Sequence, residues 1–364
     1  MDLKGKIVRK KVLKKKDTSV TILREVAKDI SDYVLVRDMP EIKYVPTLFT
    51  SYNRATGLGG HPFGRIALIH GPYQVGKSVL GLTIVESIRR KGHAAMVFDS
   101  EVAGEKEWYS AITPKSGYKV IENLDVLRDD INSMMKRLER KKEKKLIPAD
   151  TGCVFLVDTI TKLLPKNILD KIEKEGIDKM YPIQSLWISI WMKEIVPMLN
   201  RHNSALIVVL QERTKIGAGP FEKQYNITGG NAIQYDNGLR IRVTHSEKLK
   251  QGEKKVVGMQ CYYKVENNKL DGTSFQEGIY FTSNGKGGIP KGLDLVREMV
   301  EECKSRGYAV KKKDSVEFDF DNKIKFINIE GGWADCVDYF RKEKDDFKMV
   351  VSFLNKSVLR INHD

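Results

Sequence analysis

Residues 65–78 read Arg-Ile-Ala-Leu-Ile-His-Gly-Pro-Tyr-Gln-Val-Gly-Lys-Ser, and this stretch decides the fold. The apolar residues 66–69 predict a buried strand, and residues 71–78 fit the pattern G-x-x-x-x-G-K-[ST]. Apolar residues then recur at helical spacing over 79–85. A strand, a glycine-rich loop and a helix in this order predict a phosphate-binding loop, since backbone N–H groups and the helix N-terminus then face the phosphates. The alternative is a glycine-rich turn that binds no phosphate.

Each part of this loop has a distinct predicted role. Lys77 can reach the β- and γ-phosphates of a nucleotide, and Ser78 can ligate Mg²⁺. We expect the nucleotide to be held by the whole loop, that is by Gly71, Pro72, Tyr73, Gln74, Val75, Gly76, Lys77 and Ser78.

Composition restricts the class of protein. The chain has 364 residues, and its 41% hydrophobic content is enough for a globular protein of two or three domains. The net charge of +15 favours a polyanionic partner, or else reflects only a basic tail. The four scattered cysteines predict reduced thiols, without a disulfide framework or a zinc site. No apolar run has the length of a membrane span or a signal peptide, so we expect a cytoplasmic protein with no membrane partner.

Polar side chains end three further apolar runs. Residues 93–101 predict a strand that ends in Asp99-Ser100-Glu101, where Glu101 either orients a water for attack on the γ-phosphate or is a cap or surface charge. Residues 154–158, Val-Phe-Leu-Val-Asp, form a Walker B pattern in which Asp158 holds Mg²⁺. Gln211 follows a strand at 205–210 and either senses the γ-phosphate or is structural.

Three polar or basic segments lie outside the apolar runs, and two of them have the composition of nucleic-acid contacts. Residues 213–230 combine cations, glycines and isolated aromatics, which suits a segment that orders on a single strand by phosphate contact and base stacking, or an ordinary flexible loop. Residues 166–180 are polar and predict a loop or a poorly ordered helix. Residues 1–16 form a lysine-rich arm that either touches nucleic acid or is merely solvated.

The order of the expected helices and strands, together with changes in composition, predicts three regions. These are a basic arm and a helix-strand element in 1–44, a core in 45–290, and a small lobe in 291–364. The expected elements outside the motifs are a helix at 20–30, a strand at 33–36, helices at 124–145 and 187–199, strands at 239–244, 256–265 and 277–281 that continue the sheet by hairpins, a helix at 293–303 and two helices in 332–359.

The order of these motifs closely resembles the RecA recombinase family, from about residue 45 to the C-terminus. The segment that runs from Gln211 through Arg213-Thr214-Lys215-Ile216-Gly217 to the 228–232 run Thr-Gly-Gly-Asn-Ala separates recombinases from other phosphate-loop ATPases. The other shared stretches are 64–66, 71–72, 76–78, 98–101, 157–159, 264–269 and 284–289.

The resemblance implies an α/β fold: a RecA-type phosphate-loop ATPase core with three α/β/α layers and a mostly parallel sheet, a small N-terminal helix-strand element and a small C-terminal α+β lobe. It implies an ATPase that uses ATP and Mg²⁺, forms a helical filament on single-stranded DNA, and promotes pairing and strand exchange with homologous double-stranded DNA. Hydrolysis would be stimulated by DNA. We then expect the protein at the nucleoid, or in the host cytoplasm if the chain is viral.

Carried to this chain, the resemblance gives Lys77, Glu101, Gln211 and Lys269 catalytic roles and places Ser78 and Asp158 at the metal. Lys269 would complete the site of a neighbouring subunit, where Asn267 replaces a second lysine. Trp108 would stack on adenine, or is a helix-face anchor. The two DNA-binding loops, 166–180 and 213–230, would contribute Lys166, Lys171, Lys174, Lys179, Arg213, Lys215, Phe221, Lys223, Gly229, Gly230 and Asn231.

Two other functions remain open on the sequence. A hexameric helicase shares this core but brings a distinct N-terminal domain, and the region before residue 45 is too small for one. A nucleotide-gated DNA-binding scaffold or mediator that does not hydrolyse ATP is favoured by Asn267, because the missing lysine removes a positive charge that would face the phosphates.

Overall fold

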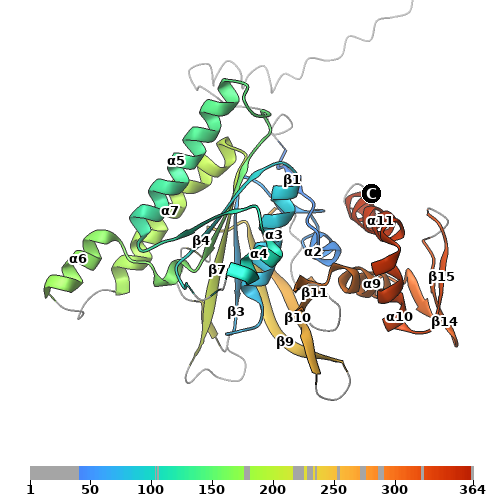
Figure 1. Cartoon of the computed structure of the whole chain (residues 1–364). Helices are drawn as coiled ribbons and strands as arrows, with labels where there is room; N and C mark the ends of the chain where they lie inside the picture. Colours follow the sequence, from blue (N-terminus) through green and yellow to red (C-terminus); the bar gives the residue numbers. More distant parts are fainter. Residues whose placement is uncertain are drawn as a thin grey trace, which may run out of the picture. The chain divides into compact units, whose positions relative to one another are not determined.

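The central sheet rests on strands that are buried on both faces. In β6 (Cys153–Asp158), Val154 and Leu156 lie in one hydrophobic core, whereas Phe155 and Val157 lie in the other. Successive side chains of a strand point to opposite faces, so a continuous apolar run requires cover on both sides. The first core is closed by α3 (Lys77–Arg90) and the second by α5 (Leu124–Glu143) and α7 (Tyr181–Arg201), which gives three layers (Figure 1).

The computed structural model describes residues 41–102, 104, 106–175, 181–215, 225–227, 233, 236–251, 255–270, 276–285, 291–320 and 324–361. The expected helix at 20–30 and strand at 33–36, like the basic arm, lie outside these residues. Within the described part of the chain, none of the helices is both long and apolar enough to cross a bilayer.

The described strands of the main sheet follow the order β12-β11-β10-β9-β3-β7-β6-β4-β5, with β8 paired to β7. The neighbours from β9 to β5 are parallel, and β9 to β12 are antiparallel, so hairpins do continue the sheet as the sequence predicts. The remaining strand bounds are β3 (Ile66–Gly71), β4 (Ala94–Asp99), β5 (Gly117–Val120), β7 (Ala205–Thr214), β8 (Tyr225–Ile227), β9 (Leu239–Gln251), β10 (Lys255–Asn268), β11 (Glu277–Ser283) and β12 (Gly292–Leu293). This mostly parallel α/β arrangement confirms the predicted fold class.

Two segments differ from the sequence prediction. Residues 166–175 form a regular helix, α6 (Lys166–Glu175), because Ile168 is buried and gives the helix an inner face. The 213–230 segment is not loop throughout: β7 extends to Thr214 and pairs antiparallel with β8, so that Arg213 lies opposite Asn226. This pairing is made by backbone hydrogen bonds, which do not require apolar side chains. The sequence of the segment therefore shows no alternating apolar pattern that would predict a strand.

Residues after β12 build a third hydrophobic core. Its elements are α9 (Leu295–Ser305), the antiparallel sheet of β13 (Ala309–Lys311), β14 (Ser315–Phe318) and β15 (Ile327–Glu330), and the helices α10 (Trp333–Lys342) and α11 (Lys344–Ile361). Besides β5, β8 and β12, the short elements of the core that the sequence analysis did not identify are β1 (Tyr44–Val45), α2 (Thr50–Ala55), β2 (His61–Pro62), α4 (Lys106–Ile112) and η2 (Ile160–Lys162). The proposed boundaries at 44 and 290 remain predictions.

Candidate active site

The phosphate-binding loop connects β3 to α3 and depends on glycine at close contacts. Gly76 has φ of 101°, in the left-handed region, and a Cβ there would lie 2.7 Å from the Tyr280 hydroxyl oxygen. That hydroxyl donates a 2.8 Å hydrogen bond to the Gly76 carbonyl. A Cβ on Gly71 would lie 2.2 Å from the carbonyl oxygen of Val243 in β9. The sheet therefore packs directly against the loop and fixes its curvature.

Lys77 is the first residue of α3 and is only 7% exposed. Burial lowers its pKa, against the opposing effect of the nearby carboxylates of Asp158, Glu101 and Glu212. Its Nζ donates to the carbonyl oxygen of Pro72, inside the loop. The ammonium is thus already held in the concave backbone of the loop, where an anion would meet it.

Carboxylates meet at the carboxyl ends of β4 and β6. The two strands are parallel neighbours, and Asp99 lies opposite Asp158. Burial raises the pKa of Asp158 to about 6, and the nearby carboxylates of Glu101 and Asp99 act in the same direction, while a hydrogen bond from Ser78 and the charge of Lys77 oppose them. Buried oxygen ligands with this excess of negative charge fit a hard cation such as Mg²⁺. Ser78 and Asp158 are therefore the residues that would hold it.

Glu101 and Gln211 are brought together by the sheet, although they lie far apart in sequence. Gln211 is the parallel partner of Gly71, so it lies level with the start of the phosphate-binding loop. Its Nε2 donates a 2.9 Å hydrogen bond to Glu101 Oε1, and Lys162 Nζ lies 3.4 Å from the same oxygen. Glu101, whose carboxylate can orient water, is thus hydrogen-bonded directly to Gln211 in β7.

Asp99 is a residue of this site that the sequence analysis did not single out. It is 1% exposed and accepts hydrogen bonds from the backbone N–H groups of Glu101 (2.8 Å) and Val102 (2.9 Å). The hydroxyls of Tyr109 and Tyr118 donate to its other oxygen at 2.9 and 2.8 Å. Asp99 therefore fixes the turn that carries Glu101. The sequence did contain a signal for Asp99, because this residue ends the same apolar run as Glu101.

Comparison with known proteins shows the family of this chain. The RecA N-terminal domain family matches residues 22–290. The chain belongs to the RecA family. Protein RecA of Aquifex pyrophilus is 29% identical over 250 residues, which are 68% of this chain and 67% of that protein. Protein RecA of Geobacter sulfurreducens is 29% identical over 262 residues, 71% and 73% of the two chains. Protein RecA of Thermus thermophilus is 28% identical over 295 residues, 78% and 79% of the two chains.

The two remaining residues that were predicted to contact the nucleotide have different surroundings. Trp108 lies in α4, half-buried against the first core, with its ring centroid 5.3 Å from that of Tyr109. This packing favours the helix-face anchor, and adenine stacking stays a prediction. Lys269 follows the end of β10, where Asn268 pairs with Leu239, which in turn pairs with Ala67. Because Gly71 lies at the other end of β3, Lys269 is at the edge of the sheet opposite its own phosphate-binding loop.

The predicted DNA contacts lie on two described elements. Lys166, Lys171 and Lys174 are exposed on α6, and Arg213 and Lys215 are exposed at the end of β7. The other residues of this prediction, Lys179, Phe221, Lys223, Gly229, Gly230 and Asn231, lie outside the described residues.

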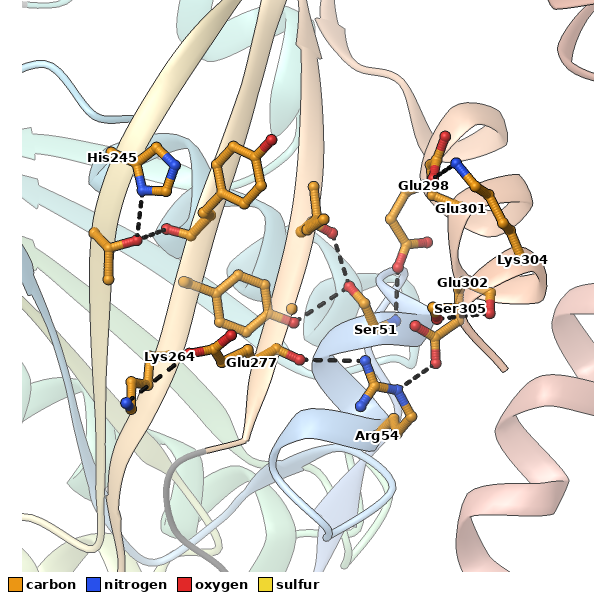
Figure 2. A pocket seen from close by; sticks show the side chains of 15 residues that line it. Ser51, Arg54, His245, Lys264, Glu277, Glu298, Glu301, Glu302, Lys304 and Ser305 are labelled. Carbon is orange, nitrogen blue, oxygen red and sulfur yellow. Dashed lines mark hydrogen bonds and ion pairs between the residues drawn. The ribbon is translucent and has the colours of Figure 1, made fainter. Parts of the chain in front are cut away.

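A separate cavity of about 460 Å³ lies between β9–β11 and the helices α2 and α9 (Figure 2). Its charged side chains pair with one another: Arg54 with Glu302 at 2.6 Å, Lys304 with Glu301 at 3.3 Å and Lys264 with Glu277 at 3.9 Å. It contains none of the predicted catalytic residues. The edge where β3, β4, β6 and β7 end therefore remains the candidate nucleotide site.

Proposed function

We propose that this RecA-family chain is an ATP-dependent recombinase. It forms a filament on single-stranded DNA and pairs that strand with a homologous duplex, and DNA stimulates its ATP hydrolysis. The observation that carries the proposal is the hydrogen bond from Gln211 to Glu101, because it joins a candidate catalytic carboxylate to the strand that leads into the 213–230 segment. The sequence of that segment, which resembles recombinases, supports it further.

The mechanism begins with the movement of Lys77. The phosphates of ATP replace the Pro72 carbonyl as the partner of its ammonium. Ser78 and Asp158 would hold Mg²⁺, which would supply positive charge to the phosphate oxygens. Glu101, whose turn is fixed by Asp99, orients a water toward the γ-phosphate.

Gln211 links this chemistry to DNA. A γ-phosphate competes with Glu101 for the Gln211 amide, so the presence of that phosphate changes the end of β7. Cations on α6 and at Arg213 neutralise DNA phosphates. Loss of the γ-phosphate then weakens the DNA-bound arrangement, as in other nucleotide-driven loops.

A second copy of the chain completes each site in this proposal. The location of Lys269 at the opposite edge of the sheet supports it, because a lysine there can reach the phosphates of a neighbour but lies away from its own loop. Asn267 leaves this contact with one positive charge fewer, and this favours a second candidate, a nucleotide-gated scaffold without turnover. Either protein would act on DNA in the cytoplasm, at the nucleoid or in a viral host.

The deciding experiment is steady-state ATP hydrolysis with and without single-stranded DNA, at low and moderate salt. We expect strong stimulation by DNA that weakens as salt rises. The Lys77→Met variant is the control for contaminating ATPases. Tight ATP binding without turnover in either condition would overturn the recombinase in favour of the scaffold.

A further inference from the structure

A fully buried histidine lies one residue before the phosphate-binding loop. His70 Nδ1 is 2.8 Å from Glu212 Oε1, and its Nε2 is 3.1 Å from Glu266 Oε2. The ring is 0% exposed, and the two carboxylate side chains are 5% and 13% exposed. Each ring nitrogen therefore lies within hydrogen-bond distance of a carboxylate oxygen, and the two carboxylates hold the ring from opposite sides.

Two arginines and a tyrosine surround these carboxylates. Arg242 donates to both oxygens of Glu212, at 2.8 and 3.1 Å, and Arg240 Nε lies 3.3 Å from Glu266 Oε2. The Tyr225 hydroxyl donates to Glu266, and the Arg242 guanidinium lies 3.9 Å from the centre of the Tyr225 ring. We call this set the His70 cluster; its members are His70, Glu212, Tyr225, Arg240, Arg242 and Glu266.

The His70 cluster joins five strands, β3, β7, β8, β9 and β10. Buried and charge-assisted hydrogen bonds of this kind resist distortion, because removal of one partner leaves another charge buried without compensation. Burial raises the pKa of Glu212, but hydrogen bonds from His70 and Arg242 outweigh this effect and hold the pKa below its usual value. The cluster therefore acts as a rigid connection between strands.

The two ends of this connection are the two functional regions. At one end, His70 precedes Gly71, and Glu212 follows Gln211, whose amide contacts Glu101. At the other end, Tyr225 belongs to β8, which pairs with the end of β7. The predicted DNA-contacting segment runs between these two strands. A shift of β8 must therefore disturb the bonds to Glu266 or carry His70 and β7 with it.

We propose that His70, Glu212 and Glu266 are positioning residues that couple the nucleotide site to β8, so that DNA contact on the 213–230 segment reaches Glu101 through Gln211. This inference rests on the proposed function. The three residues act by fixing the end of β7 relative to the phosphate-binding loop, without touching ATP or DNA themselves.

The test compares ATP hydrolysis with and without single-stranded DNA in the wild type, His70→Phe and the milder Glu266→Gln. We expect the DNA-stimulated rate to fall about tenfold in both variants, while the rate without DNA changes less than about threefold. ATP affinity with and without DNA is the second readout, since coupling is reciprocal and its loss must appear there as well. His61→Phe is the matched control, because His61 is equally buried and bonds to Tyr52 at 2.8 Å, outside the cluster.

Retention of DNA stimulation by a folded Glu266→Gln variant would overturn the inference, even if His70→Phe does not fold. An equal loss of stimulation in His61→Phe would also overturn it, because the effect would then be general to buried histidines. A wild type whose hydrolysis ignores DNA would overturn the proposed function together with the inference, so the two failures are distinguishable.

Discussion

Two groups of carboxylates in this molecule differ in what compensates their charge. At the nucleotide edge, Asp158 has Asp99 and Glu101 as neighbours, and its pKa is raised. On α9, Glu298 accepts a 2.6 Å hydrogen bond from the Ser51 N–H, and Glu302 pairs with Arg54 at 2.6 Å (Figure 2). Both groups hold a buried carboxylate with a raised pKa, so a raised pKa alone does not distinguish them. The difference lies in what surrounds them: the α9 carboxylates are paired within the chain, whereas Asp158 lies beside the phosphate-binding loop, where a ligand can reach it.

The largest expected effect is at the nucleotide edge. Lys77→Met should lower ATP turnover about 10³-fold, or about 4 kcal/mol, because the ammonium is the candidate charge for the phosphates. The stability without nucleotide should fall less than at α9, because removal of a desolvated ammonium offsets the loss of its charge beside Asp158 and of its bond to Pro72. ATP hydrolysis and urea unfolding of the same preparation measure the two effects. A loss of stability comparable to that expected at α9 would erase the distinction between the groups.

At α9 the reverse is expected. Arg54→Met should lower the free energy of unfolding by about 3 kcal/mol, because Glu302 is left buried without its cation. ATP turnover per folded molecule should stay the same, since Arg54 lies in the separate cavity. Urea unfolding and ATP hydrolysis test this. A drop in turnover at unchanged stability would show that the cavity belongs to the active site.

Part of the nucleotide edge could be predicted from the sequence. The nucleotide edge was predictable because residues 66–69, 154–157 and 205–210 are apolar runs that end at Gly71, Asp158 and Gln211. Strand ends that share an edge bring their polar residues together without long-range information.

Contacts between distant segments were not predictable. Glu302 and Arg54 are 248 residues apart, and His70 lies 196 residues from Glu266. No local periodicity encodes such pairs. Asp99 was within reach of the sequence, but its acceptance of two backbone and two tyrosine hydrogen bonds depends on a turn and on α4 and β5, which leave little apolar pattern.

The next effect is the pH dependence of stability. Burial raises the pKa of Glu298 to about 7, and the nearby carboxylate of Glu302 adds to it. The folded state therefore binds this proton more tightly than the unfolded state, so the stabilisation is present at low pH and is lost as pH rises through about 7. From pH 5 to 8 the free energy of unfolding should fall by on the order of 2 kcal/mol from this group.

The variant Glu298→Gln isolates that contribution. It cannot ionise, so its unfolding free energy should depend less on pH than that of the wild type over the same range, as measured by urea unfolding at each pH. Thr50→Val is the control, since it removes a hydroxyl that donates to Glu298 but keeps the titrating group. If the unfolding free energies of Glu298→Gln and the wild type depended on pH to the same extent, Glu298 would not be the group whose proton stabilises the fold.

The smallest effects are expected at exposed cations, one in each region. Lys162 lies 3.4 Å from Glu101 and is 53% exposed, and Lys304 lies 3.3 Å from Glu301 and is 47% exposed. Exposed pairs are screened by solvent, so Lys162→Ala and Lys304→Ala should each change stability by less than about 0.5 kcal/mol. Turnover of Lys162→Ala should stay within about threefold of the wild type, because Asp99 and not Lys162 fixes the turn of Glu101. A larger loss of turnover in Lys162→Ala, reproduced in the wild type by high salt, would contradict this prediction. It would mean that the ion pair with Lys162 holds Glu101 in place, in addition to the turn that Asp99 fixes.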